Sequence, residues 1–291
     1  MTSELTLRRT TAADVPACAK ILFDAFGGIA RQHNFPLDFP NPEMGQQLLG
    51  MFAGHPKIFG LVAERGGQVV GSNFLDQRDP IAAVGPITVN PGEQSRGVGR
   101  RLMTAVVEHG RAAGHAGIRL VQDAFNTTSM SLYTSLGFDI KEPLALMIGR
   151  PKSAAPAGAE VRPVTADDID ECAALCRAVH GFDRANELRD AMQMFRPTLL
   201  RRGGKVVAYA SAPHFWFLNH GVAEREQDLR ELLLGAAAAN DQPLALLVPT
   251  RRSEFFRWAL AEGLRVIKPM SLMAMGEYRE PRGPFYPSVG Y

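Results

Sequence analysis

The sequence of 291 residues has few cysteines, no long apolar run and almost no net charge. Its three cysteines, Cys18, Cys172 and Cys176, form neither a disulfide framework nor a zinc-binding Cys-x-x-Cys pair. No stretch reaches the ~18 apolar residues of a membrane span, and residues 1–4 do not form a basic, apolar leader. We therefore expect a cytoplasmic protein without a membrane segment. Thirty-two Lys and Arg against 30 Asp and Glu leave a charge of +2, which disfavours a nucleic-acid partner.

The sequence contains an internal repeat, because short segments of its first part recur in its second part. The length suggests two domains of roughly 150 residues each, and four short matches occur in the same order along the chain. The matching pairs are residues 8–15 with 162–169, 65–70 with 202–207, Gly137 with Gly263, and 146–147 with 272–273. The offset falls from 154 to 137 to 126 residues. This pattern predicts one ancestral unit that was copied and then shortened.

The segment between the two copies is rich in proline, alanine and glycine and lacks hydrophobic periodicity. We therefore expect a first domain at residues 1–150, a linker at 151–158 and a second domain at 159–278. Residues 279–291 contain prolines that neither a helix nor an inner strand accepts, which predicts a C-terminal tail.

Hydrophobic periodicity in the first copy predicts an alternation of strands and helices. The expected strands are 5–8, 59–63, 68–74, 81–89 and 118–121, with a final pair from residue 138 onward. The expected helices are 15–26, 98 to 110 or 114, and 129–136. Because two of these strands flank Gly66-Gly67 as a hairpin, the predicted sheet is mixed and the fold class is α/β (α+β).

The loop at residues 94–101, Gln-Ser-Arg-Gly-Val-Gly-Arg-Arg, lies between a predicted strand and a strongly amphipathic helix. Backbone N–H groups at a helix N-terminus attract phosphate, and glycines allow a close approach. The alternative is a tight turn with solvated arginines. A dinucleotide fingerprint is excluded because Leu102 replaces its third glycine, and no P-loop sequence is present.

This loop resembles the [QR]-x-x-G-x-[GA] signature of the GNAT superfamily of acetyl-CoA-dependent N-acetyltransferases, with Gln94, Gly97 and Gly99 at its fixed positions. Residues 126–138 resemble a second motif of that family, N-x-x-[SA]-x-x-L-Y-x-x-x-G-F. The two motifs together cover residues 86–138. The resemblance implies two tandem GNAT-like domains, each with a mixed, mostly antiparallel sheet, flanking helices and a splayed pair of parallel strands.

The resemblance further implies that acetyl-CoA lies between the splayed strands, with its pyrophosphate on the glycine loop. The residues implied in cofactor binding are Ile87, Thr88, Val89, Gln94, Ser95, Arg96, Gly97, Val98, Gly99, Arg100 and Asn126. No metal is implied, and the spacing of the histidines disfavours a zinc site. For Asn126, capping of a turn is an equally good explanation.

Tyr133 occupies the position of the general acid that protonates the departing thiolate of coenzyme A in this family. A buried core tyrosine is the alternative. The acceptor amine must lose a proton before it attacks, and Asp76 and Asp123, near the ends of predicted strands, are candidate bases. Both carboxylates could equally be solvated strand ends.

The second copy lacks these features, because Ala259 stands opposite Tyr133 and no [QR]-x-x-G-x-[GA] sequence occurs in residues 219–235. We therefore expect a degenerate domain that shapes the acceptor side. Residues 215–217 either line that pocket or form a buried strand, and the tail with Phe285, Tyr286 and Tyr291 is another candidate wall. In the first copy, residues 27–42 are expected to reach the acceptor.

The leading hypothesis is transfer of an acetyl group from acetyl-CoA to a small-molecule or peptidic amine. A non-catalytic acyl-CoA sensor and a scaffold that binds nothing are the alternatives. The sequence does not identify the acceptor, and it fits either a monomer or a homodimer, because a fused repeat can replace a homodimer contact.

Overall fold

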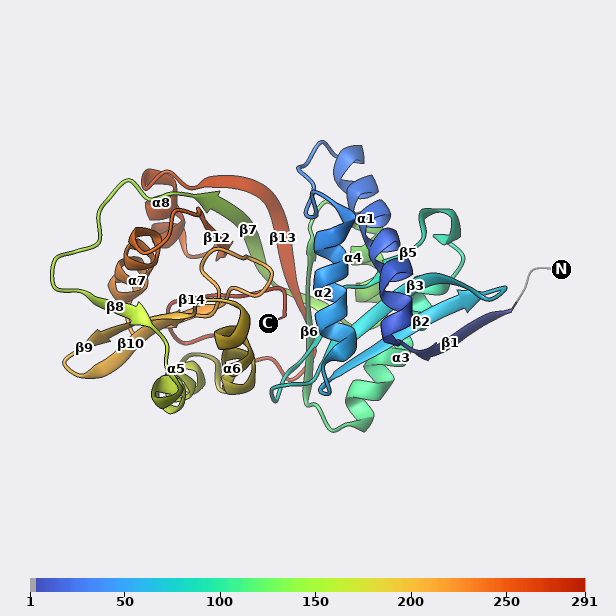
Figure 1. The fold of residues 1–291 in the computed structure, drawn as a ribbon, viewed down its shortest axis with the longest axis horizontal. Coiled ribbons are helices and arrows are strands. Elements are labelled where there is room, and N and C mark those ends of the chain that lie inside the picture. Colours follow the sequence, from blue (N-terminus) through green and yellow to red (C-terminus); the bar gives the residue numbers. More distant parts are fainter. Residues whose placement is uncertain (1–3, 291) are drawn as a thin grey trace.

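The structure is a computed structural model in which residues 4–290 are described, and helices alternate with strands along the chain (Figure 1). We call residues 4–150 the first half and 151–290 the second half. The first half contains β1 (Leu5–Arg9), η1 (Ala12–Asp14), α1 (Val15–Gln32), α2 (Pro42–Gly54), β2 (Ile58–Arg65), β3 (Gln68–Asp76), β4 (Ala82–Val84), β5 (Thr88–Val89), η2 (Pro91–Glu93), α3 (Val98–Ala112), β6 (Gly117–Asp123), α4 (Thr127–Ser135) and β7 (Asp139–Gly149). The second half contains β8 (Glu160–Pro163), η3 (Ala166–Asp168), α5 (Ile169–His180), α6 (Ala185–Met194), β9 (Thr198–Arg202), β10 (Lys205–Ala210), β11 (Gly221–Ala223), α7 (Glu226–Ala238), β12 (Leu244–Pro249), α8 (Ser253–Ala261), β13 (Arg265–Gly276) and β14 (Phe285–Tyr286).

The two halves begin with the same local structure. In the first half, the Asp14 carboxylate accepts hydrogen bonds from the backbone N–H and the hydroxyl of Thr11, which forms a capping box before α1. In the second half, Asp168 accepts the same two bonds from Thr165 before α5. These boxes satisfy backbone donors that a helix start leaves unpaired. The order of elements from β1 to β7 also matches that from β8 to β13, apart from the short β5 and η2. The division of the chain at residues 151–158 remains a prediction.

The last strands of the two halves are exchanged. β13 lies between β6 and β7, antiparallel to both, with Met270 opposite Asp123 on β6. β7 in turn pairs with β12, where Met147 is opposite Leu246. Figure 1 shows these long strands crossing from one half to the other. A nine-stranded sheet therefore joins both halves, and residues of β13 reach the centre of the first half.

The strands β4 and β6 form the predicted parallel pair, and they separate after two residue pairs. Within the described residues, Ala82 is opposite Ile118 and Ala83 is opposite Arg119, after which β5 pairs only with β3. The mixed, mostly antiparallel sheet with a splayed parallel pair is thus confirmed. In the second half, by contrast, β11 pairs with the C-terminal β14.

Three local predictions for the first half need correction. The expected strand 81–89 is broken at residues 85–87, because Pro86 has no N–H to donate to a ladder. The expected pair of strands after residue 138 is a single strand, β7. The helix α2 was not predicted, although Asn41 accepts a hydrogen bond from the Met44 N–H and Pro42 follows it at the first helical position.

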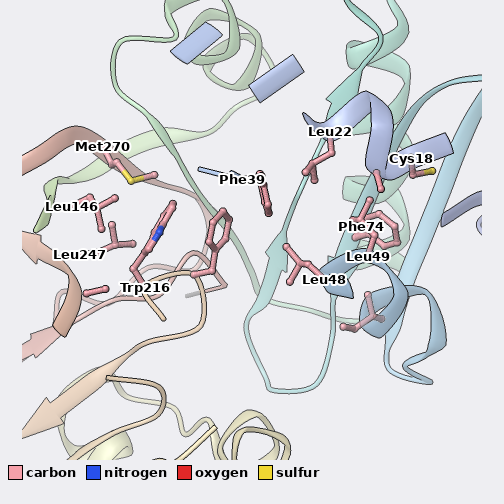
Figure 2. Packing of buried hydrophobic residues seen from close by; sticks show 14 of the residues in the cluster. Cys18, Leu22, Phe39, Leu48, Leu49, Phe74, Leu146, Trp216, Leu247 and Met270 are labelled. Carbon is pink, nitrogen blue, oxygen red and sulfur yellow. The ribbon is translucent and has the colours of Figure 1, made fainter. Parts of the chain in front are cut away.

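A shared hydrophobic cluster holds the two halves together. Figure 2 shows Leu22 and Leu48 from the first half facing Trp216 and Leu247 from the second half, with Phe39 between them. The Phe39 ring lies 5.3 Å from the ring of Phe217, between centroids. The relative position of the halves is therefore set by a continuous core. None of the helices described here is both long and apolar enough to cross a lipid bilayer.

Candidate active site

A cavity of about 730 Å³ opens where β4 and β5 separate from β6. It is lined by the glycine loop, by α1 and the start of α4, and by residues 216–218 of the second half. The sequence-predicted site residues that line it are Tyr133, Asp76, Asp123, Ile87, Thr88, Val89, Gln94, Ser95, Gly97, Gly99, Arg100 and Asn126. Arg96 and Val98 are not among its lining residues. A cavity of this size is typical of a site for a cofactor or small ligand.

The glycine loop reaches the cavity as the N-terminus of α3. Gly97 is the residue before the helix and has a φ of 80°, in the left-handed region that favours glycine. The first helical hydrogen bond runs from the Arg101 N–H to the Gly97 carbonyl, so the preceding N–H groups lie before the helical ladder. The first turn of α3 contains no acidic residue. The positive end of the helix dipole thus faces the cavity and favours an anion there.

The arginines of the loop differ in their positions. Arg100 lines the cavity and donates a hydrogen bond to the Ser135 hydroxyl over 2.9 Å. Arg96 is exposed and forms an ion pair of 3.2 Å with Glu93, while Arg101 donates to the Leu5 carbonyl. Val98 is buried in the core beneath α3. Of these arginines, Arg100 is the one whose position suits a ligand phosphate.

Tyr133 is part of the core and also lines the cavity, so its position is compatible with either of the two roles considered for it. Its ring packs in the core, 6.4 Å from the ring of Phe138 between centroids, and the residue also lines the cavity. Burial raises the pKa of Tyr133 to about 12, although a hydrogen bond with Ser129 opposes the shift. The phenol is therefore protonated at neutral pH and can donate a proton or a hydrogen bond into the cavity.

Asn126 and Gln94 shape the walls of the cavity through local hydrogen bonds. The Asn126 side-chain oxygen accepts from the Ser129 N–H over 3.1 Å, so Asn126 caps α4 as well as lining the cavity. The Gln94 side chain donates to the Val89 carbonyl over 3.3 Å. This bond ties the glycine loop to β5.

The two candidate bases have different partners. The Asp76 carboxylate accepts hydrogen bonds of 3.0 and 2.9 Å from Nε of Arg78, so both of its oxygens already have a partner. Asp123 lies at the end of β6, and its Oδ1 is 2.6 Å from Nζ of Lys268 on β13. The exchange of strands therefore brings a buried lysine of the second half to Asp123.

Sequence reasoning missed the partner of this lysine. Nζ of Lys268 is also 2.6 Å from Oδ1 of Asp38, a residue 230 positions earlier in the chain. Burial raises the pKa of Asp38; the Lys268 ammonium opposes the shift, and the Asp123 carboxylate adds to it. A lysine at an inner position of the largely apolar β13 was the available signal. The predicted segment 27–42 does reach the cavity, through Asp38 among others.

The aromatic residues of the second half lie in a loop and do not form the buried strand that was one of the two expectations. Trp216 and Phe217 line the cavity, and Nζ of Lys268 lies 5.2 Å from the Trp216 ring centroid. In the tail, Phe285 and Tyr286 are buried away from the cavity, whereas Val289 and Gly290 line it. Tyr291 lies outside the described residues.

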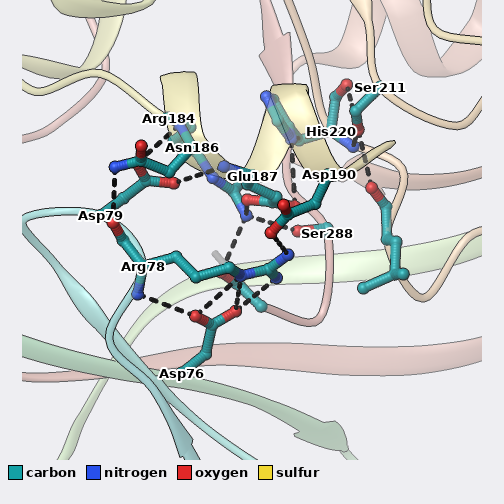
Figure 3. A network of polar contacts seen from close by, with 12 residues as sticks. Asp76, Arg78, Asp79, Arg184, Asn186, Glu187, Asp190, Ser211, His220 and Ser288 are labelled. Carbon is teal, nitrogen blue, oxygen red and sulfur yellow. Dashed lines mark hydrogen bonds and ion pairs between the residues drawn. The ribbon is translucent and has the colours of Figure 1, made fainter. Parts of the chain in front are cut away.

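A polar network fixes the second half beside the cavity (Figure 3). Arg78 bridges Asp76 of the first half and Asp190 on α6, with a contact of 3.0 Å to the latter. Asp79 accepts hydrogen bonds of 3.1 Å from the N–H groups of Asn186 and Glu187, which caps the start of α6. Burial raises the pKa of Asp79 to about 6. The network positions α6 and leaves Asp76 fully engaged.

Comparisons with known proteins identify the family of this chain. The model of the acetyltransferase (GNAT) family matches residues 20–138, which include both motifs. An IAA acetyltransferase of Azospirillum brasilense is 30% identical over 106 residues, which cover 33% of this chain and 69% of that relative. The chain therefore belongs to the GNAT family of acetyltransferases, as its motifs indicated.

Other relatives match over shorter segments. A mycothiol acetyltransferase of Nocardia farcinica is 38% identical over 63 residues, so the match spans 22% of this chain and 21% of that relative. Among solved structures, a proposed acetyltransferase from Pyrococcus horikoshii covers 99% of this chain and is itself covered to 94%, with a TM-score of 0.76 and 17% identity. A GCN5-related N-acetyltransferase from Sphaerobacter thermophilus has a TM-score of 0.62 over 95% of this chain and 96% of its own, with 13% identity. These two structures show that the fold extends over both halves.

Proposed function

We propose that the protein transfers the acetyl group of acetyl-CoA to a primary amine, in a small molecule or a peptide. The observation that carries the proposal is one cavity that contains both a helix N-terminus free of acidic residues and the protonated phenol of Tyr133. The diphosphate of the cofactor binds at residues 94–100, with Arg100 as its charged partner. The thioester lies beside Ile87, Thr88 and Val89, between the separated strands.

The reaction is a direct attack without an acyl-enzyme. The lone pair of the neutral amine forms a bond to the thioester carbonyl carbon, and the resulting oxyanion is stabilised by an N–H group of residues 87–89. Collapse of this intermediate breaks the carbon–sulfur bond. The thiolate of coenzyme A takes a proton from the Tyr133 hydroxyl, the nitrogen that attacked releases its extra proton to solvent to give the neutral amide, and Tyr133 is reprotonated from solvent.

The ammonium form of the acceptor must release one proton before the attack, because the pKa of a simple alkylamine is about 10.4. Of the two candidate bases, we retain Asp123, because both oxygens of Asp76 accept hydrogen bonds from Arg78, whereas Asp123 shares Lys268 with Asp38. Asp123 accepts this proton directly or through a water molecule and passes it to solvent. The second half acts as a degenerate copy that completes the acceptor side, and the protein works as a monomer or a homodimer.

The experiment that tests the proposal is a calorimetric titration with acetyl-CoA, followed by an assay of free thiol release with a panel of amines. We expect binding of acetyl-CoA and thiol release that depends on an amine. The double variant Gly97→Ala/Gly99→Ala should weaken binding at least about tenfold, because it strains a left-handed position and adds methyl groups beside the diphosphate.

The matched control is Gly50→Ala, at an exposed position of α2 where an added Cβ meets no atom within 4 Å. It should leave the affinity for acetyl-CoA unchanged. If the unaltered protein gives no heat with acetyl-CoA, it is a scaffold and the proposal is wrong. Binding without thiol release from any amine would instead favour an acyl-CoA sensor.

A further inference from the structure

One part of the cavity is built by both halves of the chain. Phe26 and Asp38 of the first half line it together with Trp216, Phe217 and Met270 of the second half. We call this part the acceptor chamber. Its walls are continuous with the shared core of Figure 2, in which Trp216 and Met270 lie together. The chamber thus has rigid, largely apolar walls.

Three buried charges stand at the edge of this chamber. Nζ of Lys268 lies 2.6 Å from an oxygen of Asp38 and 2.6 Å from an oxygen of Asp123, and the three side chains are 2%, 7% and 8% exposed. Two carboxylates and one ammonium group leave a net charge of −1. Burial of an uncompensated charge is unfavourable, which raises the pKa of Asp38 and favours the approach of a further cation to the trio.

A second polar group in the cavity also lacks a partner. Gln122 lines the cavity and is 7% exposed, yet neither the oxygen nor the nitrogen of its side chain has a hydrogen-bond partner within residues 4–290. Buried amides are normally paired, so an unpaired one beside a cavity points to a ligand. Gln122 precedes Asp123 on β6, so its side chain points to the opposite face of that strand and lines a different part of the cavity wall.

Apart from Arg100, the charged residues that line the cavity are acidic. The lining carboxylates are Asp24, Asp38, Asp76 and Asp123, whereas the described lining residues include no lysine and a single arginine, Arg100, at the glycine loop. Because Asp76 is paired with Arg78 and Asp24 with Lys20, the cavity is cationic at the loop and acidic at the trio. Such a separation attracts an anionic cofactor to one end and a cation to the other.

We propose that the acceptor is a primary amine with a single positive charge and an apolar, preferably aromatic, body. This inference rests on the proposed function and adds the class of acceptor to it. The ammonium group supplies the missing charge beside Asp38 and Asp123, and the body packs against Trp216, Phe217 and Met270. An ammonium group near an aromatic face gains further stabilisation.

The same arrangement rejects other amines. An α-amino acid would bring its carboxylate next to the two carboxylates of the trio, where like charges repel. An amino sugar would place several hydroxyl groups against aromatic walls that offer them no hydrogen bonds. The structure therefore separates three amines of similar size: 2-phenylethylamine, phenylalanine and glucosamine.

The first experiment compares these three amines by thiol release in the presence of saturating acetyl-CoA. We expect kcat/KM for 2-phenylethylamine to exceed that for phenylalanine and for glucosamine at least about tenfold. If acetyl-CoA binds and phenylalanine or glucosamine is the better acceptor, the proposed function stands and the inference is wrong. If acetyl-CoA does not bind, the proposed function itself is wrong.

The second experiment uses Asp38→Asn, which brings the net charge of the trio to zero. KM for 2-phenylethylamine should rise at least about tenfold, while the Kd for acetyl-CoA changes less than about twofold. The neutral product, N-(2-phenylethyl)acetamide, reports on shape without charge, so its Kd should also change less than about twofold. An equal loss of amine and product binding would mean that Asp38 acts only through structure, and this result overturns the inference.

The matched control is Glu142→Gln. Glu142 is also buried and ion-paired, 2.7 Å from Arg251, but it does not line the cavity. This variant should leave KM for 2-phenylethylamine unchanged, whatever its effect on stability. If Glu142→Gln raises KM as much as Asp38→Asn does, the effect comes from loss of any buried charge, and the assignment of the acceptor chamber fails.

Discussion

The two halves of the molecule have the same order of elements, but the space beside their central strands is open in the first half and filled in the second. In the first half, the space between β5 and β6 is an open cavity. In the second half, β14 pairs with β11 and also packs against β12, and Tyr286 of β14 is fully buried. Its hydroxyl donates to the Asn219 side chain over 3.3 Å. The C-terminal tail therefore fills in one half the position that a ligand can enter in the other.

The helices that follow these strands, α3 and α7, also differ in the charge of their first turns. The first turn of α3 has no acidic residue, whereas α7 begins with Glu226 and Asp228. Asp228 is fully buried and accepts a hydrogen bond of 2.9 Å from Arg225 before the helix. An acidic first turn occupies the positive end of the helix dipole, and it repels a phosphate. An acidic first turn and a filled cleft thus occur together in the second half.

The largest expected effect is on kcat, and it distinguishes a tyrosine of the first half from a control tyrosine of the second half. In the first half, Tyr133→Phe removes the proposed acid, so kcat for acetyl transfer should fall about 100-fold or more while the Kd for acetyl-CoA stays the same. In the second half, Tyr209→Phe removes a buried hydroxyl that lies 3.0 Å from His220. This control should lower stability and leave kcat unchanged. Equal kcat values for Tyr133→Phe and the unaltered protein would remove Tyr133 from the mechanism.

Much of the first half follows from its sequence, because its signals are local. The alternation of helices and strands and the position of the loop before α3 follow from periodicity and glycine spacing over short distances. The likeness of residues 8–15 to 162–169 similarly predicts two equivalent helix starts, and the structure has the same capping box at Asp14 and at Asp168.

The acceptor side could not be derived in this way. The contact of Asp38 with Lys268 depends on the exchange of β7 and β13, which no local pattern reports. Likewise, Trp216 and Phe217 have the composition of a buried strand, yet they lie in a loop because the other half packs against them. Contacts between distant segments override local propensity at these positions.

A second prediction concerns the filled cleft. Tyr286→Ala should reduce the free energy of unfolding by about 3–5 kcal/mol, because it leaves a cavity in place of a fully buried aromatic ring. The number of acetyl-CoA molecules bound should stay at one, since the acidic start of α7 still repels the diphosphate. Denaturant unfolding and calorimetric titration measure the two quantities. A second bound acetyl-CoA in this variant would show that the tail alone distinguishes the halves.

The smallest effect tests what the halves have in common. Asp14 and Asp168 are each held by an arginine at 2.7 Å, Arg8 in the first half and Arg162 in the second. Asp14→Asn and Asp168→Asn should each lower the free energy of unfolding by about 1–2 kcal/mol, because an amide accepts weaker hydrogen bonds from the arginine and from the helix start. Because β7 and β13 are exchanged, we expect one cooperative transition for both variants. Two separate transitions would mean that the halves fold independently.

The stability that Asp14 and Asp168 contribute should depend on pH. The hydrogen bonds from Arg8 and Arg162 hold the pKa values of Asp14 and Asp168 well below their usual range, against the opposing effect of burial. In the unfolded chain, an aspartate has a pKa of about 3.9. The two carboxylates therefore contribute stability above that pH, and their contribution is lost as the pH falls further towards the folded values. Each Asn variant should flatten the fall in stability of the protein below about pH 4. Asp168 also lies 3.4 Å from Arg201, a contact worth at most about 1 kcal/mol, so Asp168→Asn should cost up to that much more than Asp14→Asn. A loss confined to Asp14→Asn would mean that the second half keeps the shape of the capping box without its energetic role.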